Sequence, residues 1–407
     1  MTTDTRAANT RRLPFDGLRV LDVSQGIAGP YCAHLLWQQG ADVVKVEPPA
    51  GDWARPLGVV SGDLSSVVIA FNGGKRAICV DGAKAEGRGV IARLAADADV
   101  IVQNFRPGVA AKLGLDPAAM CASRPDLVYV SISGYGPDGP YADAPATDSV
   151  IQADAGLMFA NRAADGAPRK IGLFLADMNS GLYAAQAAAA ALYRRATGGG
   201  GEHVEVSLFD TCAATLVGNL VEDAMDPSRA TRPARPVSSP NGTYTAADGA
   251  INVVALDDAQ FERVCRAIGR TEWLADPRFA NAAIRLANRE QMEPLMAEAL
   301  RTRPVADWVD RFREAGVLHA PVRTYAQLPA HPQARHAGTF EPIEQPGLGT
   351  LAWAGHPARA MRRPIEPVPH LGEHTLEVLE RAGFSGAERA ALLAGGAVVQ
   401  RDRTTAA

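Results

Sequence analysis

Between residues 17 and 135 the sequence alternates short apolar runs with stretches of helical composition, and this alternation restricts the possible folds more than any other feature. Short apolar runs that are bounded by turn residues and separated by helix-length segments predict βαβ units and a parallel sheet. We therefore expect an α/β fold with a doubly wound sheet, whose ligand crevice lies at the carboxyl ends of the strands. The expected strands are Arg19–Val23, Val43–Glu47, Ala77–Val80, Val100–Asn104 and Leu127–Ile132.

The pattern changes after Asp210, where a helix leads into a stretch rich in Pro, Arg and Ser that resembles a linker. A smaller α+β unit follows, and Pro-rich connections precede a tail that carries two helices. The predicted organisation is a large domain over 13–225, a linker over 226–241, a small domain over 242–328 and a second linker with the C-terminal tail over 329–407.

Composition excludes several classes of protein. With 407 residues, of which 47% are hydrophobic, the chain can bury a large core. Its formal charge of −4, with scattered basic residues, gives no reason to expect nucleic acid as a partner. The polar, basic first 12 residues lack the apolar core of a signal peptide, and the run Ala185–Leu192 is too short to span a bilayer, so we expect a cytoplasmic enzyme with no membrane partner. Five cysteines without a CxxC pair and dispersed histidines predict neither a disulfide framework nor a metal site.

One acid, Asp177, stands between an apolar approach and a long Ala-rich helix. Strong helix formers dominate Leu182–Arg195, and the four glycines Gly198–Gly201 end the run. Unpaired N–H groups and the positive end of the helix dipole favour the ionised form of a carboxylate at a helix start. Asp177 is therefore a candidate nucleophile, although an aspartate in such a place is also a common N-cap.

The first predicted strand is followed by a glycine-bearing turn, Ser24–Pro30, that opens a helix. Glu47 ends the next strand about 20 residues later, a spacing that imitates a dinucleotide site, although the third glycine of that motif is missing. The turn is thus compatible with an NAD-dependent dehydrogenase and equally with a tight strand–helix connection.

Five motifs, in order along the chain, resemble those of the class III CoA-transferases (CaiB/BaiF type), a group that includes formyl-CoA:oxalate CoA-transferase. They are the opening βαβ unit Leu18–Asp52, the turn Asn72–Arg76, the block Asn104–Gly108 with Lys112–Gly114, the loop Gly134–Pro140, and the segment Gly166–Asp210 that contains Asp177. The likeness covers nearly the whole chain and is densest before residue 215.

The resemblance implies a Rossmann-like large domain to which the C-terminal tail returns, and coenzyme A or acyl-CoA as substrate without a prosthetic group. It implies Asp177 as a covalent nucleophile. Lys75 and Lys112 would meet the phosphates of CoA, whereas Pro48 stands where some members carry an arginine. The implied CoA contacts are Ile27, Ala28, Asn72, Gly73, Gly74, Lys75, Asn104, Phe105, Arg106 and Lys112.

The same resemblance implies an interlocked homodimer and a carboxylic acid acceptor, with small dicarboxylates as plausible substrates. Racemases of acyl-CoA share the fold but use a histidine in a G-H-D motif, and Thr147 stands at that place before Asp148. A non-enzymatic acyl-CoA-binding protein is the third alternative, in which Asp177 would be chemically idle.

Overall fold

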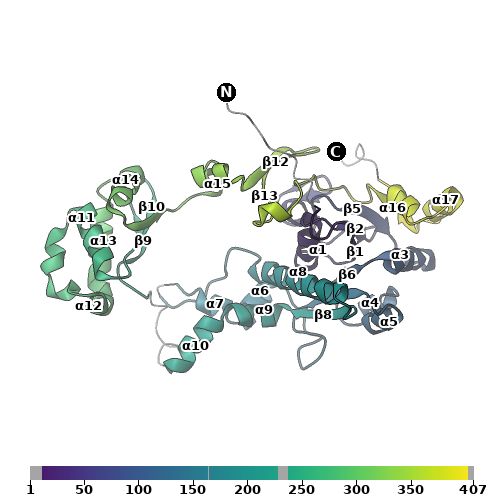
Figure 1. Ribbon diagram of the computed structural model, residues 1–407, viewed down its shortest axis with the longest axis horizontal. Coiled ribbons are helices and arrows are strands. Elements are labelled where there is room, and N and C mark those ends of the chain that lie inside the picture. The colour runs from purple at the N-terminus through teal and green to yellow at the C-terminus, as the bar shows by residue number, and fades with distance from the viewer. Residues whose placement is uncertain (1–11, 164, 228–236, 402–407) are drawn as a thin grey trace. The chain divides into compact units, whose positions relative to one another are not determined.

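The computed structural model describes residues 12–163, 165–227 and 237–401, and these form two compact units (Figure 1). The first unit contains the described residues up to 227 together with those from 337 onward, and the second contains 237–336. The predicted small domain over 242–328 falls within the second unit, whereas residues 228–236 of the predicted linker lie outside the described part.

A seven-stranded sheet forms the centre of the first unit, in the order β14-β5-β2-β1-β6-β7-β8. All neighbours are parallel except β14, which pairs antiparallel with β5. The five expected strands are confirmed, with ends that differ by about one residue, and β8 and β14 extend the sheet at its two edges. The strand bounds are β1 (Arg19–Asp22), β2 (Asp42–Glu47), β5 (Arg76–Val80), β6 (Val100–Gln103), β7 (Val128–Ser133), β8 (Glu202–Ser207) and β14 (Val398–Val399).

Helices cover both faces of this sheet, as the apolar runs predict (Figure 1). Along each strand successive side chains point to opposite faces, so one strand supplies two cores. Val20 and Val100 pack in a core with α1 (Ala28–Gln38) and α8 (Leu175–Ala196). Leu21 and Ile101 pack in the opposite core, which is covered by α3 (Ala85–Asp97), α5 (Pro117–Ser123), α16 (Thr375–Arg381) and α17 (Gly386–Ala394).

The small residues of α8 let this helix lie close to α1. Ala184, Ala188 and Ala191 are buried in the shared core. A Cβ atom on Gly181 would lie 2.6 Å from the carbonyl oxygen of Ala28, so only glycine fits at this crossing. The Ala-rich run of the sequence is therefore a buried helix–helix contact, and it fixes the start of α8 next to the start of α1.

Shorter elements complete the first unit, and the second unit has its own core around a three-stranded antiparallel sheet. No helix among the described residues has the length and apolar character needed to cross a bilayer. The shorter elements of the first unit are β3 (Val60–Ser61), β4 (Leu64–Ser65), α2 (Ser66–Asn72), α4 (Val109–Lys112), α6 (Asp148–Asp154), α7 (Leu157–Ala160), α9 (Leu208–Thr215), α10 (Val217–Met225), β12 (Phe340–Gln345) and β13 (Gly349–Ala354). The remaining elements are β9 (Asn241–Thr245), β10 (Ala250–Val254), α11 (Asp258–Ile268), α12 (Ala282–Ala287), α13 (Arg289–Leu300), α14 (Val305–Ala315), β11 (Leu318–Pro321) and α15 (Pro332–Ala337).

Candidate active site

A cavity of about 650 Å³ lies at the carboxyl ends of β1, β6 and β7. The chain leaves β1 towards β2 on one side, and β6 lies on the other, so the cavity is at the point where the strand order reverses. Open α/β sheets bind their ligands at such switch points. Six of the residues selected from the sequence line this cavity: Ile27, Ala28, Asn104, Phe105, Arg106 and Asp177.

Asn104 joins the two loops that meet at the switch point. Its side-chain amide donates to the carbonyl oxygen of Gln25 at 2.6 Å, and its side-chain oxygen accepts from the Gln25 amide at 2.8 Å. These paired bonds lock the loop after β6 to the loop after β1. Asn104 therefore shapes the cavity floor in addition to lining it.

Gly26 lets the turn after β1 approach an aromatic wall of the cavity. Its φ of 81° lies in the left-handed region, and a Cβ atom would clash with the ring of Trp53, which also lines the cavity. The Gly26 amide donates to the buried carboxylate of Asp52 at 2.8 Å, which holds the turn in place. The glycine predicted as part of a nucleotide motif is thus required by local packing.

Asp177 is the third residue of α8, is half-buried, and faces the cavity. Burial, together with the negative charge of Asp148, raises the pKa of Asp177 to about 7. The expectation that the helix start would favour the ionised form is therefore wrong in direction. Burial is the main cause, and the second is a negative charge already placed at the helix end.

That charge belongs to Asp148, the first residue of α6. Its Oδ2 accepts hydrogen bonds from the amides of Ala176 at 2.9 Å and Asp177 at 3.3 Å. Asp148 is thus the acid that satisfies the start of α8, and Asp177 is not an N-cap. Within the described part of the chain the Asp177 carboxyl group makes no hydrogen bond, so it is available to a ligand.

Lys75 lies elsewhere, in a buried ion network beneath the turn after β1. It is 1% exposed, and its Nζ donates to Asp22 Oδ2 at 2.8 Å, to the Pro30 carbonyl at 2.8 Å and to Asn72 Oδ1 at 2.9 Å. Although burial opposes the charge of Asp22, Lys45 and Lys75 hold the pKa of that carboxyl group below its ordinary value. The three donor positions of Lys75 are filled, so its assignment to CoA phosphate is corrected to a structural one.

The rest of the predicted turn lies with Lys75 outside the cavity lining. Asn72 is buried and donates to the Val68 carbonyl, and the Gly74 amide donates to the Pro367 carbonyl at 3.0 Å. A Cβ atom on Gly73 would lie 2.9 Å from the Glu366 carbonyl oxygen. Asn72 is thus buried and the C-terminal segment covers Gly73 and Gly74, so these three residues do not line the cavity that holds Asp177.

Lys112 and Glu47 have opposite surroundings. Lys112 is exposed at the end of α4, whose first residue Val109 lines the cavity. Glu47 is buried and bonded to the Arg55 guanidinium at 2.6 and 2.7 Å and to the Asp52 amide at 2.9 Å. Its oxygens are thereby engaged within the protein, so Glu47 is unsuited to bind the ribose of NAD.

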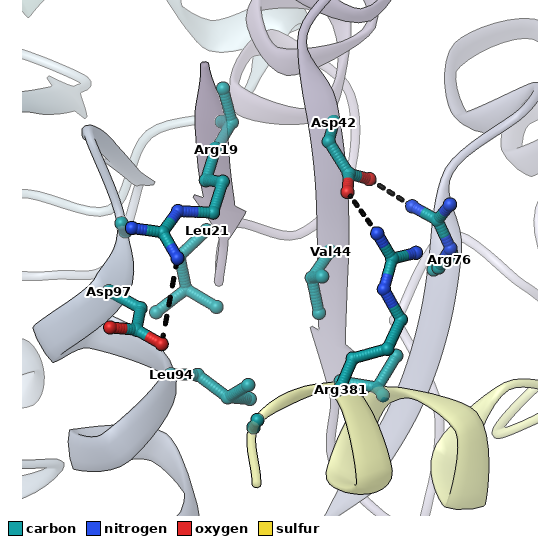
Figure 2. A pocket seen from close by; sticks show the side chains of 12 residues that line it. Arg19, Leu21, Asp42, Val44, Arg76, Leu94, Asp97 and Arg381 are labelled. Atoms are coloured by element: carbon teal, nitrogen blue, oxygen red, sulfur yellow. Dashed lines mark hydrogen bonds and ion pairs between the residues drawn. The ribbon is translucent and has the colours of Figure 1, made fainter. Parts of the chain in front are cut away.

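A smaller cavity of about 180 Å³ lies at the opposite end of the strands, where β1, β2 and β5 begin. Figure 2 shows Asp42 between Arg76 and Arg381, and Arg19 directed at Asp97. The charged side chains that line it thus form ion pairs with one another. Ion pairs therefore stabilise the amino ends of these strands, and Asp177 does not line this cavity.

Comparisons with known proteins identify the family to which the protein belongs. A sequence profile of CoA-transferase family III matches residues 15–375, and the protein belongs to that family of enzymes. It is 31% identical to the succinate–glutarate CoA-transferase of Agrobacterium fabrum over 91% of this chain and 96% of that protein. It is 35% identical to the acetyl-CoA:oxalate CoA-transferase of Acetobacter aceti over 79% of this chain and 83% of that protein. The crystal structure of a CAIB/BAIF family protein from Brucella suis superimposes with a TM-score of 0.83 at 32% identity, covering 91% of this chain and 100% of that one.

Proposed function

We propose that the protein moves coenzyme A from an acyl-CoA donor to a carboxylic acid acceptor, with Asp177 as the covalent nucleophile. The observation that carries the proposal is the free carboxyl group of Asp177 in the switch-point cavity. An aspartate with a purely structural role would be held by hydrogen bonds, as Asp148 is. With a pKa of about 7, a substantial fraction of Asp177 is ionised at neutral pH, so it needs no separate base.

The proposed reaction has two symmetrical halves. The Asp177 carboxylate attacks the thioester carbonyl of the donor, a C–O bond forms, and the C–S bond breaks to release CoA thiolate. The thiolate then attacks the aspartyl carbonyl of the mixed anhydride, which expels the donor carboxylate and leaves an aspartyl-CoA thioester. The acceptor carboxylate attacks this thioester, and the returning thiolate attacks the acceptor carbonyl. Acceptor-CoA leaves, and Asp177 is again a carboxylate.

The start of α1 is suited to the negative charge that develops on the thioester oxygen. Ile27 and Ala28 line the cavity where this 11-residue helix begins. The first amides of a helix have no intrahelical acceptor and lie at the positive end of its dipole. We assign these backbone amides the role of stabilising the oxyanion.

The nucleotide part of CoA would follow the loop after β6. Asn104, Phe105 and Arg106 line the same cavity as Asp177, and Lys112 stands exposed one helical turn beyond Val109. Arg106 and Lys112 supply positive charge suited to the diphosphate and the 3′-phosphate. This route replaces the one through Lys75.

The acceptor we propose is a small dicarboxylate, because the relatives above carry names that specify succinate, glutarate and oxalate. A racemase would need a histidine where Thr147 lines the cavity. We further propose an interlocked homodimer. Light scattering tests the dimeric state, since the expected mass is twice 42.8 kDa and a monomer at micromolar concentration would contradict the proposal.

An exchange assay tests the proposed function. The purified protein is incubated with succinyl-CoA, acetyl-CoA or formyl-CoA and a panel of mono- and dicarboxylic acids, and new acyl-CoA species are separated by chromatography. Asp177→Ala should lose exchange with every pair and stay folded, with a melting temperature no lower than that of the wild type. Asp154→Asn, an exposed change in α6, is the matched control and should exchange normally. Exchange by Asp177→Ala would refute the assignment of the nucleophile.

A further inference from the structure

Asp148 links α6 to the start of α8. The side chain of Asp148 is 5% exposed, and it accepts from the Ala176 and Asp177 amides through Oδ2 and from the Gln152 side-chain amide through Oδ1 at 2.7 Å. Phe174, the residue at the N-cap of α8, makes no side-chain capping bond. The helix turn that carries Asp177 is therefore held by a carboxylate from α6.

Gln152 extends this connection to the segment that leads into α8. It is fully buried, its amide also donates to the Leu173 carbonyl at 2.9 Å, and its side-chain oxygen accepts from the Ile171 amide at 3.0 Å. The approach segment, Asp148 and the first turn of α8 thus form one hydrogen-bonded unit. Because the hydrogen-bond partners of Asp148 among the described residues are all N–H donors, its contacts suit a carboxylate anion.

Among the described residues, the charged and titratable groups around Asp177 come from three elements. Asp148 approaches from α6, and Arg106 lines the cavity from the loop after β6. From α9, burial and the two aspartates raise the pKa of the Cys212 thiol to about 11, so this thiol is uncharged at neutral pH. The lining residues Ile27 and Ala28 of the α1 start are uncharged. Asp148 is accordingly the negative charge that acts on Asp177.

We propose that Asp148 is a positioning residue for the nucleophile: it fixes the first turn of α8, and its negative charge favours the acylated, uncharged form of Asp177 over the free carboxylate. The proposal rests on the function proposed above. When Asp177 attacks the thioester, the negative charge passes with the electron pair to the CoA thiolate, and Asp177 becomes a neutral anhydride. The repulsion between the two carboxylates is then relieved. The same repulsion makes the free Asp177 more basic and so a stronger nucleophile.

Asp148→Asn separates the two parts of this role. The single side-chain oxygen of asparagine can keep the hydrogen bonds to α8, while the charge and the hydrogen bond to Gln152 are lost. The pH dependence of Asp177 acylation is measured in single turnovers by quench and peptide mass spectrometry. In the wild type the rate should be half-maximal near pH 7, and in Asp148→Asn at a lower pH, because burial remains but the charge of Asp148 is removed. Each pH unit by which this midpoint falls corresponds to a roughly tenfold smaller equilibrium ratio of acylated to free enzyme.

Asp154→Asn controls for loss of an acid from the same helix and should keep the wild-type profile. If Asp148→Asn does not fold, Asp148→Ser removes the same charge and supplies a second variant for the same measurement. The role of Asp148 would be overturned by a folded variant that still becomes acylated, with a rate half-maximal near pH 7 and an unchanged equilibrium ratio of acylated to free enzyme. Absence of any acylation in the wild type would instead overturn the proposed function, so the two failures are distinguishable.

Discussion

Replacing Lys75 distinguishes a buried structural lysine from a ligand for CoA phosphate. Lys75→Met removes three hydrogen bonds of 2.8 to 2.9 Å and leaves the fully buried carboxylate of Asp22 with Lys45, at 4.0 Å, as its remaining ion-pair partner. Breaking a buried pair by removing one member costs about 3–5 kcal/mol. At roughly 2–4 °C per kcal/mol for a large domain, the melting temperature should fall by at least about 6 °C.

Lys112→Met is the matched control, because Lys112 is exposed and its replacement should change stability by less than about 0.5 kcal/mol. Differential scanning fluorimetry and the KM for acyl-CoA are measured on both variants. We expect Lys75→Met to lose stability. We expect Lys112→Met to raise KM roughly tenfold, as the loss of about 1.5 kcal/mol from one charge-assisted contact implies. Asp22→Asn combined with Lys75→Met should recover part of the lost stability, because no uncompensated charge remains. Wild-type stability of Lys75→Met together with a raised KM would refute this reasoning.

Two further predictions concern the cavity. The pKa of Asp177 lies at about 7 rather than 3.8, so the folded protein binds more protons than the unfolded chain between these values, and its stability falls as the pH rises from about 4 to 7. Asp177→Asn should therefore stabilise the protein by roughly 2–4 kcal/mol at pH 8 and by little at pH 4, and equal melting shifts at both values would contradict the raised pKa. Gly26→Ala should cost about 1–3 kcal/mol and lower kcat/KM, since its Cβ atom meets Trp53 at a φ of 81°. Gly89→Ala in α3, where a Cβ atom meets nothing within 4 Å, should melt no lower than the wild type, and equal behaviour of the two variants would count against the clash.

Much of the sheet could be predicted from the sequence because its strands are short apolar runs between turns. The position of Asp177 near the start of a long helix followed from the Ala-rich run and the glycines that end it. The edge strand β14 has only two residues, and it is a strand only because it pairs with β5, which lies far earlier in the sequence. Such a strand has no local pattern to recognise.

The surroundings of the charged residues could not be predicted from the sequence, because they depend on contacts between distant segments. Asp148 accepts a hydrogen bond from the amide of Asp177 although the two residues are 29 positions apart in the sequence. The residues next to Asp177 therefore do not indicate that a carboxylate already binds the helix start. The sequence suggests Lys75 as a CoA contact because no local pattern shows that it is buried. Its burial depends on contacts with Asp22 and with the Pro30 carbonyl of α1. A signal was nevertheless present: Asp22 and Lys45 each interrupt an apolar strand, and a charge within a buried strand requires a partner.

The central claim is that Asp177 forms covalent bonds during transfer, and an oxygen label tests it most directly. In the proposed reaction one oxygen of the acceptor acid remains on Asp177 when acceptor-CoA leaves. The enzyme is therefore turned over with an acceptor acid whose carboxylate carries ¹⁸O, digested, and analysed by peptide mass spectrometry. We predict ¹⁸O in the peptide that contains Asp177 and in no peptide of Asp177→Asn. Complete exchange of CoA between donor and acceptor with an unlabelled Asp177 would contradict the covalent mechanism.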